Sequence, residues 1–164
     1  MSFEEFTRTC LPPLLRFAKV LCGSRELAED VVQEVLVRAY GRWDRIVSLD
    51  KPDAYVRRMI VNEFLSWRRK CGRVVPRAEV SGTDVSPDPS GGYVERAALA
   101  SELRNLPRKQ QTVIVLRFYC GLSDAEIADE LGCTTGTVRS HASRALATLR
   151  VQMCPIPSLS SKGI

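Results

Sequence analysis

The sequence has almost none of the residue groupings on which enzyme chemistry depends. One histidine is present in 164 residues, and the six cysteines form no C-x-x-C pair and no Cys/His cluster with zinc spacing. A glycine-rich phosphate loop is also missing. We therefore expect no catalytic residue, no metal site, no cofactor and no small-molecule substrate. We expect the thiols to be idle in a reducing compartment.

Long apolar runs are missing as well. No run approaches the roughly 20 apolar residues needed to cross a bilayer. The N-terminus, MSFEEFTRTC, is acidic and lacks the basic-then-apolar layout of a signal peptide. The hydrophobic fraction of 45% and the charged fraction of 26% are typical of a globular protein. The sequence thus predicts a cytoplasmic protein without membrane insertion.

Positive charge is in excess, and the charged residues are unevenly distributed along the chain. The net charge is +5, which is compatible with a nucleic-acid partner but does not establish one. Residues 54–73 contain six bases and one acid, whereas residues 24–38 contain four acids and two bases. This separation indicates that different faces of the protein bind different partners.

Two helical blocks flank a segment that has few apolar residues to bury. Residues 80–92, VSGTDVSPDPSGG, are dense in Gly, Pro, Ser and Asp and are typical of a flexible linker. No strong alternating strand pattern is present on either side of it. We predict an all-α protein of two small helical domains, residues 1–73 and 93–152, joined by a flexible linker at 74–92 and followed by a tail at 153–164.

The first block contains three predicted helices. The first covers about residues 2–21 and is interrupted or bent near LPPLL, because proline removes a helical hydrogen bond. The second restarts after Ser24, a good N-cap. The third runs from near Pro52 to Lys70. Its buried stripe is formed by Val56, Ile60, Phe64 and Trp67.

The second block contains the pattern of a helix-turn-helix, SDAEIADELGCTTGTVRSHASRAL. Ser123 and Glu126 have the spacing of a capping box at the start of a short helix. Gly132 permits a left-handed turn, and Thr134 caps the helix that follows. Five apolar residues form the predicted inner face of that second helix: Val138, Ala142, Ala145, Leu146 and Leu149.

The outer face of the same helix carries hydroxyls, arginines and the single histidine, and residues 132–150 contain no acid. Short polar groups and arginines near a helix N-terminus are what base edges and phosphates require. We therefore predict DNA contacts from this face, against the alternative of a helical hairpin with a merely solvated basic side. The predicted contact residues are Thr134, Thr135, Gly136, Thr137, Arg139, Ser140, His141, Ser143 and Arg144.

At these residues the chain resembles a known family. LPRKQQTVIVLRFYCGLSDAEIADELGCTTGTVRSHASRALATLR resembles region 4 of extracytoplasmic-function (ECF) RNA polymerase sigma factors, members of the sigma-70 family. Separately, AEDVVQEVLVRAYGRWDRI and PDAYVRRMIVNEFLSWRRK resemble its region 2, and NEFLSWRRK is similar to the actinobacterial SigE-like branch. The resemblance covers nearly all of residues 3–150 apart from the linker.

The resemblance implies two further sites in the first block. One is a polymerase-binding site with an apolar centre at Val32 and Leu36 and a charged rim; its residues are Asp30, Gln33, Glu34 and Leu36. The other contacts and melts the downstream promoter element through Trp43, Arg57, Arg58, Asn62, Trp67, Arg68, Arg69 and Lys70. Core packing competes with base stacking for both tryptophans and is favoured for Trp67. Ser66 stands where many members of the family have aspartate.

The function implied is that of a sigma factor. Such a protein binds core RNA polymerase and directs promoter recognition and strand opening, and its partners are core RNA polymerase, promoter DNA and, in many members, an anti-sigma factor. The alternative is a free-standing helix-turn-helix regulator of the response-regulator type, which requires an effector domain of alternating strands and helices.

Overall fold

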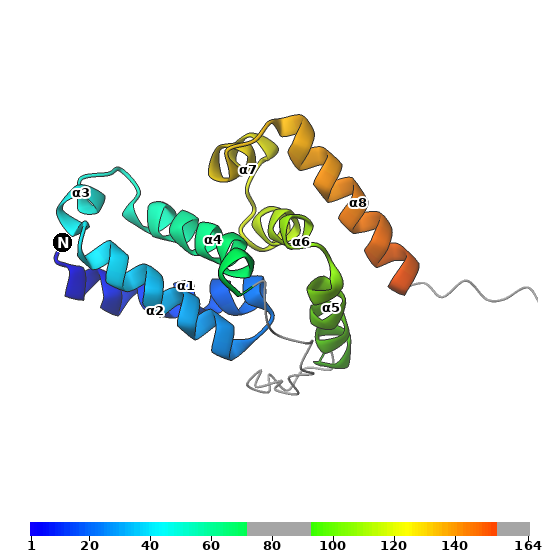
Figure 1. Ribbon diagram of the computed structural model, residues 1–164, viewed down its shortest axis with the longest axis horizontal. Helices are drawn as coiled ribbons and strands as arrows, with labels where there is room; N and C mark the ends of the chain where they lie inside the picture. Colours follow the sequence, from blue (N-terminus) through cyan, green and yellow to red (C-terminus); the bar gives the residue numbers. More distant parts are fainter. Residues whose placement is uncertain (72–92, 154–164) are drawn as a thin grey trace, which may run out of the picture.

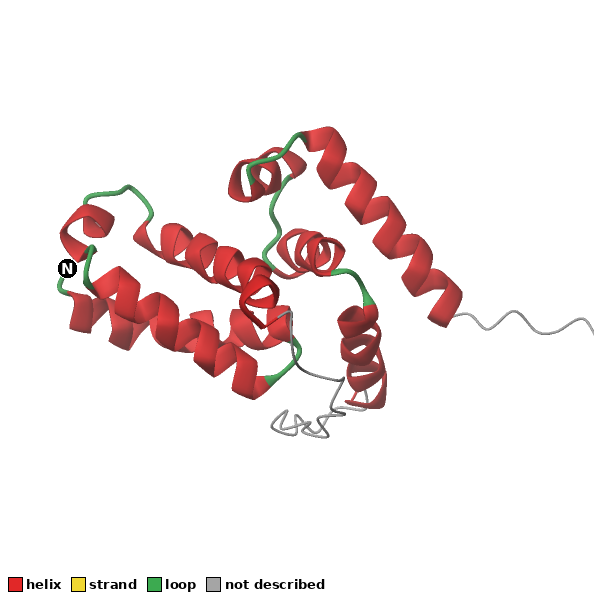
Figure 2. Ribbon diagram, viewed as in Figure 1, coloured by secondary structure: helices red, strands yellow, loops and turns green. Residues whose placement is uncertain are grey.

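The computed structural model describes residues 1–71 and 93–153, and every regular element within them is a helix (Figure 2). The predicted all-α class is therefore confirmed. The predicted linker at 74–92 and the tail beyond Met153 lie outside the described residues. So do the side chains of three predicted DNA contacts: Arg68, Arg69 and Lys70.

The first block consists of four helices: α1 (Phe3–Cys22), α2 (Arg25–Tyr40), α3 (Trp43–Val47) and α4 (Pro52–Cys71). Helices α1 and α2 form a hairpin because Gly23, at φ 67°, reverses the chain. Ser24 caps α2, since its Oγ accepts from Leu27 N at 3.4 Å. Helix α4 packs on both (Figure 1). The buried face of α2 includes Val31, Val35 and Ala39.

Helix α1 continues through the two prolines, so of the predicted interruption or bend near LPPLL the interruption is wrong. Pro12 and Pro13 are both exposed, and Leu14 and Phe17 directly after them are buried in the core. Tertiary packing of the apolar face outweighs the missing backbone hydrogen bonds.

The second block consists of α5 (Tyr93–Asn105), α6 (Arg108–Ile114), the π-helical segment η1 (Val115–Tyr119), α7 (Asp124–Leu131) and α8 (Thr135–Met153). Pro107 is the N-cap of α6, one residue before the helix proper. Gly121, at φ 67°, turns the chain between η1 and α7. Helix α8 packs against α6 and α7, with Val138 and Ala142 buried.

The two blocks are packed against each other. One continuous apolar cluster includes Phe17, Leu21 and Phe64 from the first block and Val113 and Leu116 from the second. Helix α6 lies beside the C-terminal half of α4, between the first block and α8 (Figure 1). A contiguous cluster of this kind is the usual sign of a shared core.

Candidate nucleic-acid interface

The helix-turn-helix is built from local contacts that match the sequence pattern. Ser123 Oγ accepts from Glu126 N at 3.3 Å, and Glu126 Oε2 accepts from Ser123 N at 2.8 Å. Glu126 Oε2 also accepts from the Ser123 hydroxyl at 2.8 Å, and the two hydrogen bonds donated by Ser123, first that of its backbone N–H, lower the pKa of Glu126. Gly132 has φ 63°, and Thr134 Oγ1 accepts from Thr137 N at 3.2 Å. The capping box, the left-handed turn and the second cap are all confirmed.

Helix α8 presents one apolar and one polar face. Four of the five predicted inner residues are buried, and Leu146 is half-buried against them. The predicted outer residues are exposed except for a half-buried His141; the exposed ones are Thr134, Thr135, Gly136, Thr137, Arg139, Ser140, Ser143 and Arg144. The arrangement leaves a polar, acid-free face of α8 directed away from the core.

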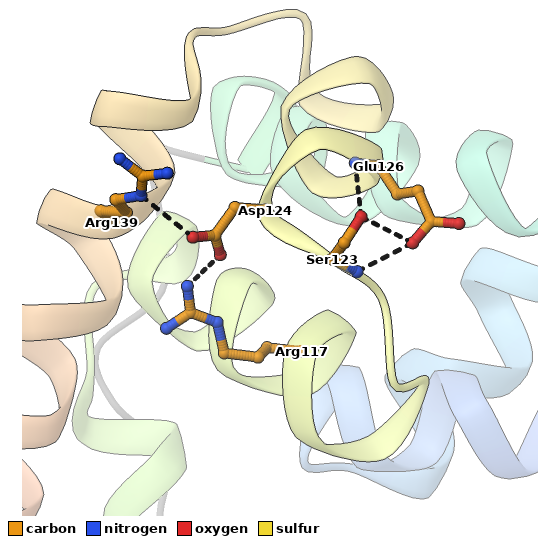
Figure 3. A network of polar contacts seen from close by, with 5 residues as sticks. All are labelled: Arg117, Ser123, Asp124, Glu126 and Arg139. Atoms are coloured by element: carbon orange, nitrogen blue, oxygen red, sulfur yellow. Dashed lines mark hydrogen bonds and ion pairs between the residues drawn. The ribbon is translucent and has the colours of Figure 1, made fainter.

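An acid reaches this face from the neighbouring helix. Asp124, the first residue of α7, lies between Arg117 of η1 and Arg139 of α8 and pairs with both (Figure 3). Arg139 Nε donates to Asp124 Oδ2 at 3.2 Å. The hydrogen bond from Arg117 and then that from Arg139 lower the pKa of Asp124, so the carboxylate is charged at neutral pH. Asp124 thereby orients the Arg139 guanidinium in the structure without DNA.

A shallow cleft beside this network is lined by three arginines. The cleft has a volume of about 330 Å³ and is bounded by Arg117, Arg139 and Arg150 together with Ser143. Guanidinium groups gathered around an open groove suit phosphate oxygens. Arg117 and Arg150 were not among the DNA contacts predicted from the sequence. Arg150 follows the predicted contact Ser143 by seven residues, about two helical turns, and could have been found by helical spacing.

His141 is half-buried at the edge of the outer face. Desolvation and the nearby charges of Lys109 and Arg144 lower its pKa, so the imidazole is neutral at pH 7. A neutral ring contributes hydrogen bonding but no charge to a phosphate contact. Its Nδ1 is buried without a hydrogen-bond partner among the described residues.

The predicted downstream-element residues on α4 are not equally accessible. Arg58 and Asn62 are exposed. Arg57 is turned toward the second block, where its Nη2 donates to Glu130 Oε1 of α7 at 2.6 Å. Burial alone would lower the pKa of Arg57, but the hydrogen bond and charge of Glu130 raise it overall. Arg57 is therefore held by a protein carboxylate in this conformation.

Both tryptophans make packing contacts within the first block. The Trp43 ring lies 5.3 Å from Phe3 and 4.8 Å from Phe6, measured between ring centroids, and its Nε1 donates to the Met1 carbonyl at 3.3 Å. Trp67 is half-buried against the apolar cluster. These contacts favour the packing role that competed with base stacking.

The acidic face of α2 is exposed, but its apolar centre differs from the one predicted. Asp30, Gln33 and Glu34 are exposed and Leu36 is half-buried. Val32 is 1% exposed and belongs to the core, so its place in an interface is wrong. Val37 is 72% exposed and is the apolar residue available beside these polar groups. It follows Asp30 by seven positions, and that helical spacing could have identified it.

Four cysteines whose side chains the structure describes are free thiols: Cys10, Cys22, Cys120 and Cys133. Burial raises the pKa of Cys22 to about 12 and also raises the pKa of Cys10 and of Cys120. Because the thiolate is the reactive form, these three are weak nucleophiles at neutral pH. Within residues 1–71 and 93–153, no group of three or more His, Cys, Asp or Glu side chains has a metal-binding arrangement. None of the helices there has the length and apolarity to span a membrane.

Comparison with known families gives two matches, one in each block. Residues 6–74 match Sigma-70 region 2, and residues 96–149 match Sigma-70, region 4. The two matches account for the acidic and basic helices of the first block and for the helix-turn-helix of the second.

Similar proteins extend over most of the chain. An RNA polymerase sigma-E factor of Streptomyces avermitilis is 39% identical over 93% of this chain and 86% of its own length. The ECF RNA polymerase sigma factor SigL of Mycobacterium tuberculosis is 35% identical over 85% of this chain and 82% of its own. Among solved structures, the sigma factor RpoE of Bartonella quintana, in complex with the anti-sigma factor NepR, is similar with a TM-score of 0.68. It is 26% identical, and the match covers 92% of this chain and 96% of that one.

Proposed function

This chain belongs to the ECF RNA polymerase sigma factors of the sigma-70 family, which bind core RNA polymerase and direct promoter recognition, and we propose which of its surfaces perform these tasks. The outer face of α8 reads the upstream promoter element. The exposed side of α4 contacts and helps to open the downstream element. The acidic side of α2 binds the polymerase.

The observation that carries the upstream assignment is the outer face of α8. Arg139 and Arg144 are exposed on a helix whose N-terminal turn is capped by Thr134 and whose opposite side is buried. A helix presented in this way fits the major groove, where arginine recognises guanine and hydroxyl groups contact either bases or phosphates. Arg117 and Arg150 extend the same basic surface toward the DNA backbone.

For the downstream element, we propose phosphate contacts from Arg57 and Arg58, together with the basic cluster at residues 68–70, and a base contact from Asn62. Exposure of Arg58 and Asn62 supports this proposal. Neutralising phosphates releases counterions, so the contact weakens steeply with salt. We assign Trp43 and Trp67 first to packing, and stacking on an unpaired base is their secondary proposed role.

For the polymerase contact, we propose Asp30, Gln33 and Glu34 with Val37 as the exposed apolar residue and Leu36 at its edge. The domain boundaries at 73 and 93 and the cytoplasmic location are part of the same proposal. An anti-sigma protein is a further proposed partner, because the similar RpoE was crystallised with one. We propose no chemistry of its own for the chain.

Run-off transcription with purified core RNA polymerase on a pooled promoter library tests the proposal. Start sites that require the protein are expected. If none is found and the protein alone binds duplex DNA tightly, the free-standing regulator is the better description. That alternative is disfavoured by the region 2 match of the first block, which a response-regulator effector domain would not give.

A further inference from the structure

Arg139 is an exposed side chain that is nevertheless restrained. The side chain is 71% exposed, and an arginine in such a position ordinarily samples many rotamers. Here its Nε donates to Asp124 Oδ2 at 3.2 Å. This contact joins α8, the second helix of the helix-turn-helix, to the first residue of α7. The guanidinium is therefore held in one place before any DNA is bound.

The contact uses Nε of Arg139 and leaves the outer edge of the guanidinium. The two terminal nitrogens, Nη1 and Nη2, point away from Asp124 (Figure 3). Arginine recognises guanine by donating two hydrogen bonds, to O6 and N7, and a pair of parallel N–H groups suits this purpose. The geometry is therefore that of an arginine already turned toward a base edge, with a carboxylate behind it.

The Asp124 carboxylate is fixed from its other side. Arg117 of η1 pairs with Oδ1, so each carboxylate oxygen binds one guanidinium (Figure 3). The Arg117 and Asp124 side chains are only 26% and 24% exposed, and the backbone of Asp124 follows the capping box of Ser123 and Glu126. An isolated exposed ion pair restrains little, whereas a network of charges anchored on a partly buried pair restrains more.

We propose that Asp124 is a positioning residue for base recognition, which holds Arg139 toward one base pair of the upstream element and prevents it from turning to neighbouring phosphates. The proposal rests on the proposed function of α8 and names a determinant of its specificity. Phosphates offer an arginine strong contacts that carry no sequence information. The carboxylate disfavours those contacts because it restrains the side chain and repels phosphate oxygens. Asp124 thus increases sequence preference and not total affinity.

A purely structural role of Asp124 leads to a different expectation. An acid in the first turn of a helix stabilises that helix through its dipole. If this were its whole contribution, removing the charge would weaken α7 and reduce activity on every promoter alike. A positioning role instead changes the preference at one base pair and leaves the others as they are. The two roles are therefore separable by measuring preference position by position.

The test uses Asp124→Asn, with Asp129→Asn as its matched control. Asparagine keeps the size of the side chain and removes the charge that pairs with both arginines. Asp129 is an exposed acid on the same helix, so the control makes the same chemical change. Run-off transcription with core RNA polymerase is carried out on the selected promoter with its upstream element randomised. Sequencing of the products gives the preference at each base pair, and Arg139→Ala identifies the base pair that Arg139 reads.

We expect Asp124→Asn to lower the preference at that base pair by about threefold to tenfold, the range for one hydrogen bond. Preferences at the other base pairs, and the total product from the pool, should match those of Asp129→Asn and of the wild-type chain. In the Arg139→Ala background, Asp124→Asn should have no further effect on preference, because the two residues act as one unit.

Unchanged preference at that base pair overturns the proposal, and so does an equal loss on all sequences, which is the result expected for a structural role. An effect of Asp124→Asn that persists with Arg139→Ala overturns it as well. Circular dichroism checks folding, and Asp124→Ala, which introduces the residue of highest helix propensity, decides if Asp124→Asn does not fold. Absence of product from any promoter with the wild-type chain would instead refute the proposed function.

Discussion

The two basic surfaces of the molecule hold their arginines in different ways. On α4, Arg57 is 23% exposed and is bound to Glu130 of the other block. On α8, Arg139 is 71% exposed and pairs with Asp124 at 3.2 Å. The upstream surface is therefore accessible in this conformation, whereas the downstream surface is partly occupied by protein. The packing of the blocks, not the number of arginines, distinguishes the two surfaces.

The largest expected effect comes from removing the accessible surface. Arg139→Ala with Arg144→Ala should lower run-off transcription from the selected promoter by about a hundredfold, because each arginine contact to a base or phosphate contributes on the order of 1–3 kcal/mol. Both side chains are exposed, so the thermal unfolding midpoint should stay the same. Arg16→Ala, at an exposed arginine of α1, is the control. Equal activity of the double variant and the control would contradict the proposal that α8 contacts the promoter.

A smaller effect is expected from a pair that stabilises the first block. Arg38 of α2 pairs with Glu63 of α4, whose side chain is 2% exposed. Arg38→Met removes this contact to a buried carboxylate and should lower the free energy of unfolding by about 2 kcal/mol, a value reduced for the partial exposure of Arg38. Denaturant unfolding measures it. Arg139→Met removes an exposed arginine of the second block and should leave the unfolding midpoint unchanged. A loss of stability equal to that of Arg38→Met would contradict the difference drawn between the two pairs.

Two identical caps allow a direct comparison of the blocks. Ser2 with Glu5 begins α1, and Ser123 with Glu126 begins α7, each as a capping box. Replacing either serine by alanine should reduce stability by about 1 kcal/mol. Only Ser123→Ala should also weaken promoter binding, since α7 positions Asp124 and the turn before α8. An equal loss of binding in Ser2→Ala, measured by gel shift of the polymerase complex, would contradict this.

The smallest effect is expected from pH. The pKa of His141 lies below its ordinary value of 6.5, so the folded state favours the neutral ring. The contribution to stability is complete above pH 6.5 and is lost as the pH falls from 6.5 through the lowered folded pKa, because the unfolded chain takes up the proton first. His141→Gln should flatten this part of the pH profile of unfolding. An unchanged profile would show that another group titrates there.

Local features of the sequence predicted local features of the structure. The capping box of Ser123, the turn at Gly132 and the cap at Thr134 depend on residues three or four apart, so the pattern alone identifies them. The outer face of α8 follows from helical periodicity in the same way. For this reason the helix-turn-helix was the most predictable part of the site.

Long-range pairs were not predictable from local patterns. Glu130 is 73 positions from Arg57, and Gln111 is 90 positions from Leu21. Each of these side chains is unremarkable on its own helix, and the pairing depends on how the blocks pack. The burial of Val32 was missed for a related reason, because α2 contacts both α1 and α4 and so buries a wider stripe than a helix with one neighbour. Tertiary packing also kept α1 continuous through its prolines.

The buried thiol of Cys22 can report on separation of the two blocks. Its thiol is 7% exposed at the end of α1 and borders an open cleft of about 500 Å³ together with Phe64, Arg108 and Gln111, the residues through which the blocks meet. Separation of the blocks would expose this thiol and lower its pKa toward the ordinary value, since burial is what raises it. The rate at which an alkylating reagent modifies the peptide containing Cys22 would therefore measure how often the two blocks separate. No engineered label is needed for this measurement.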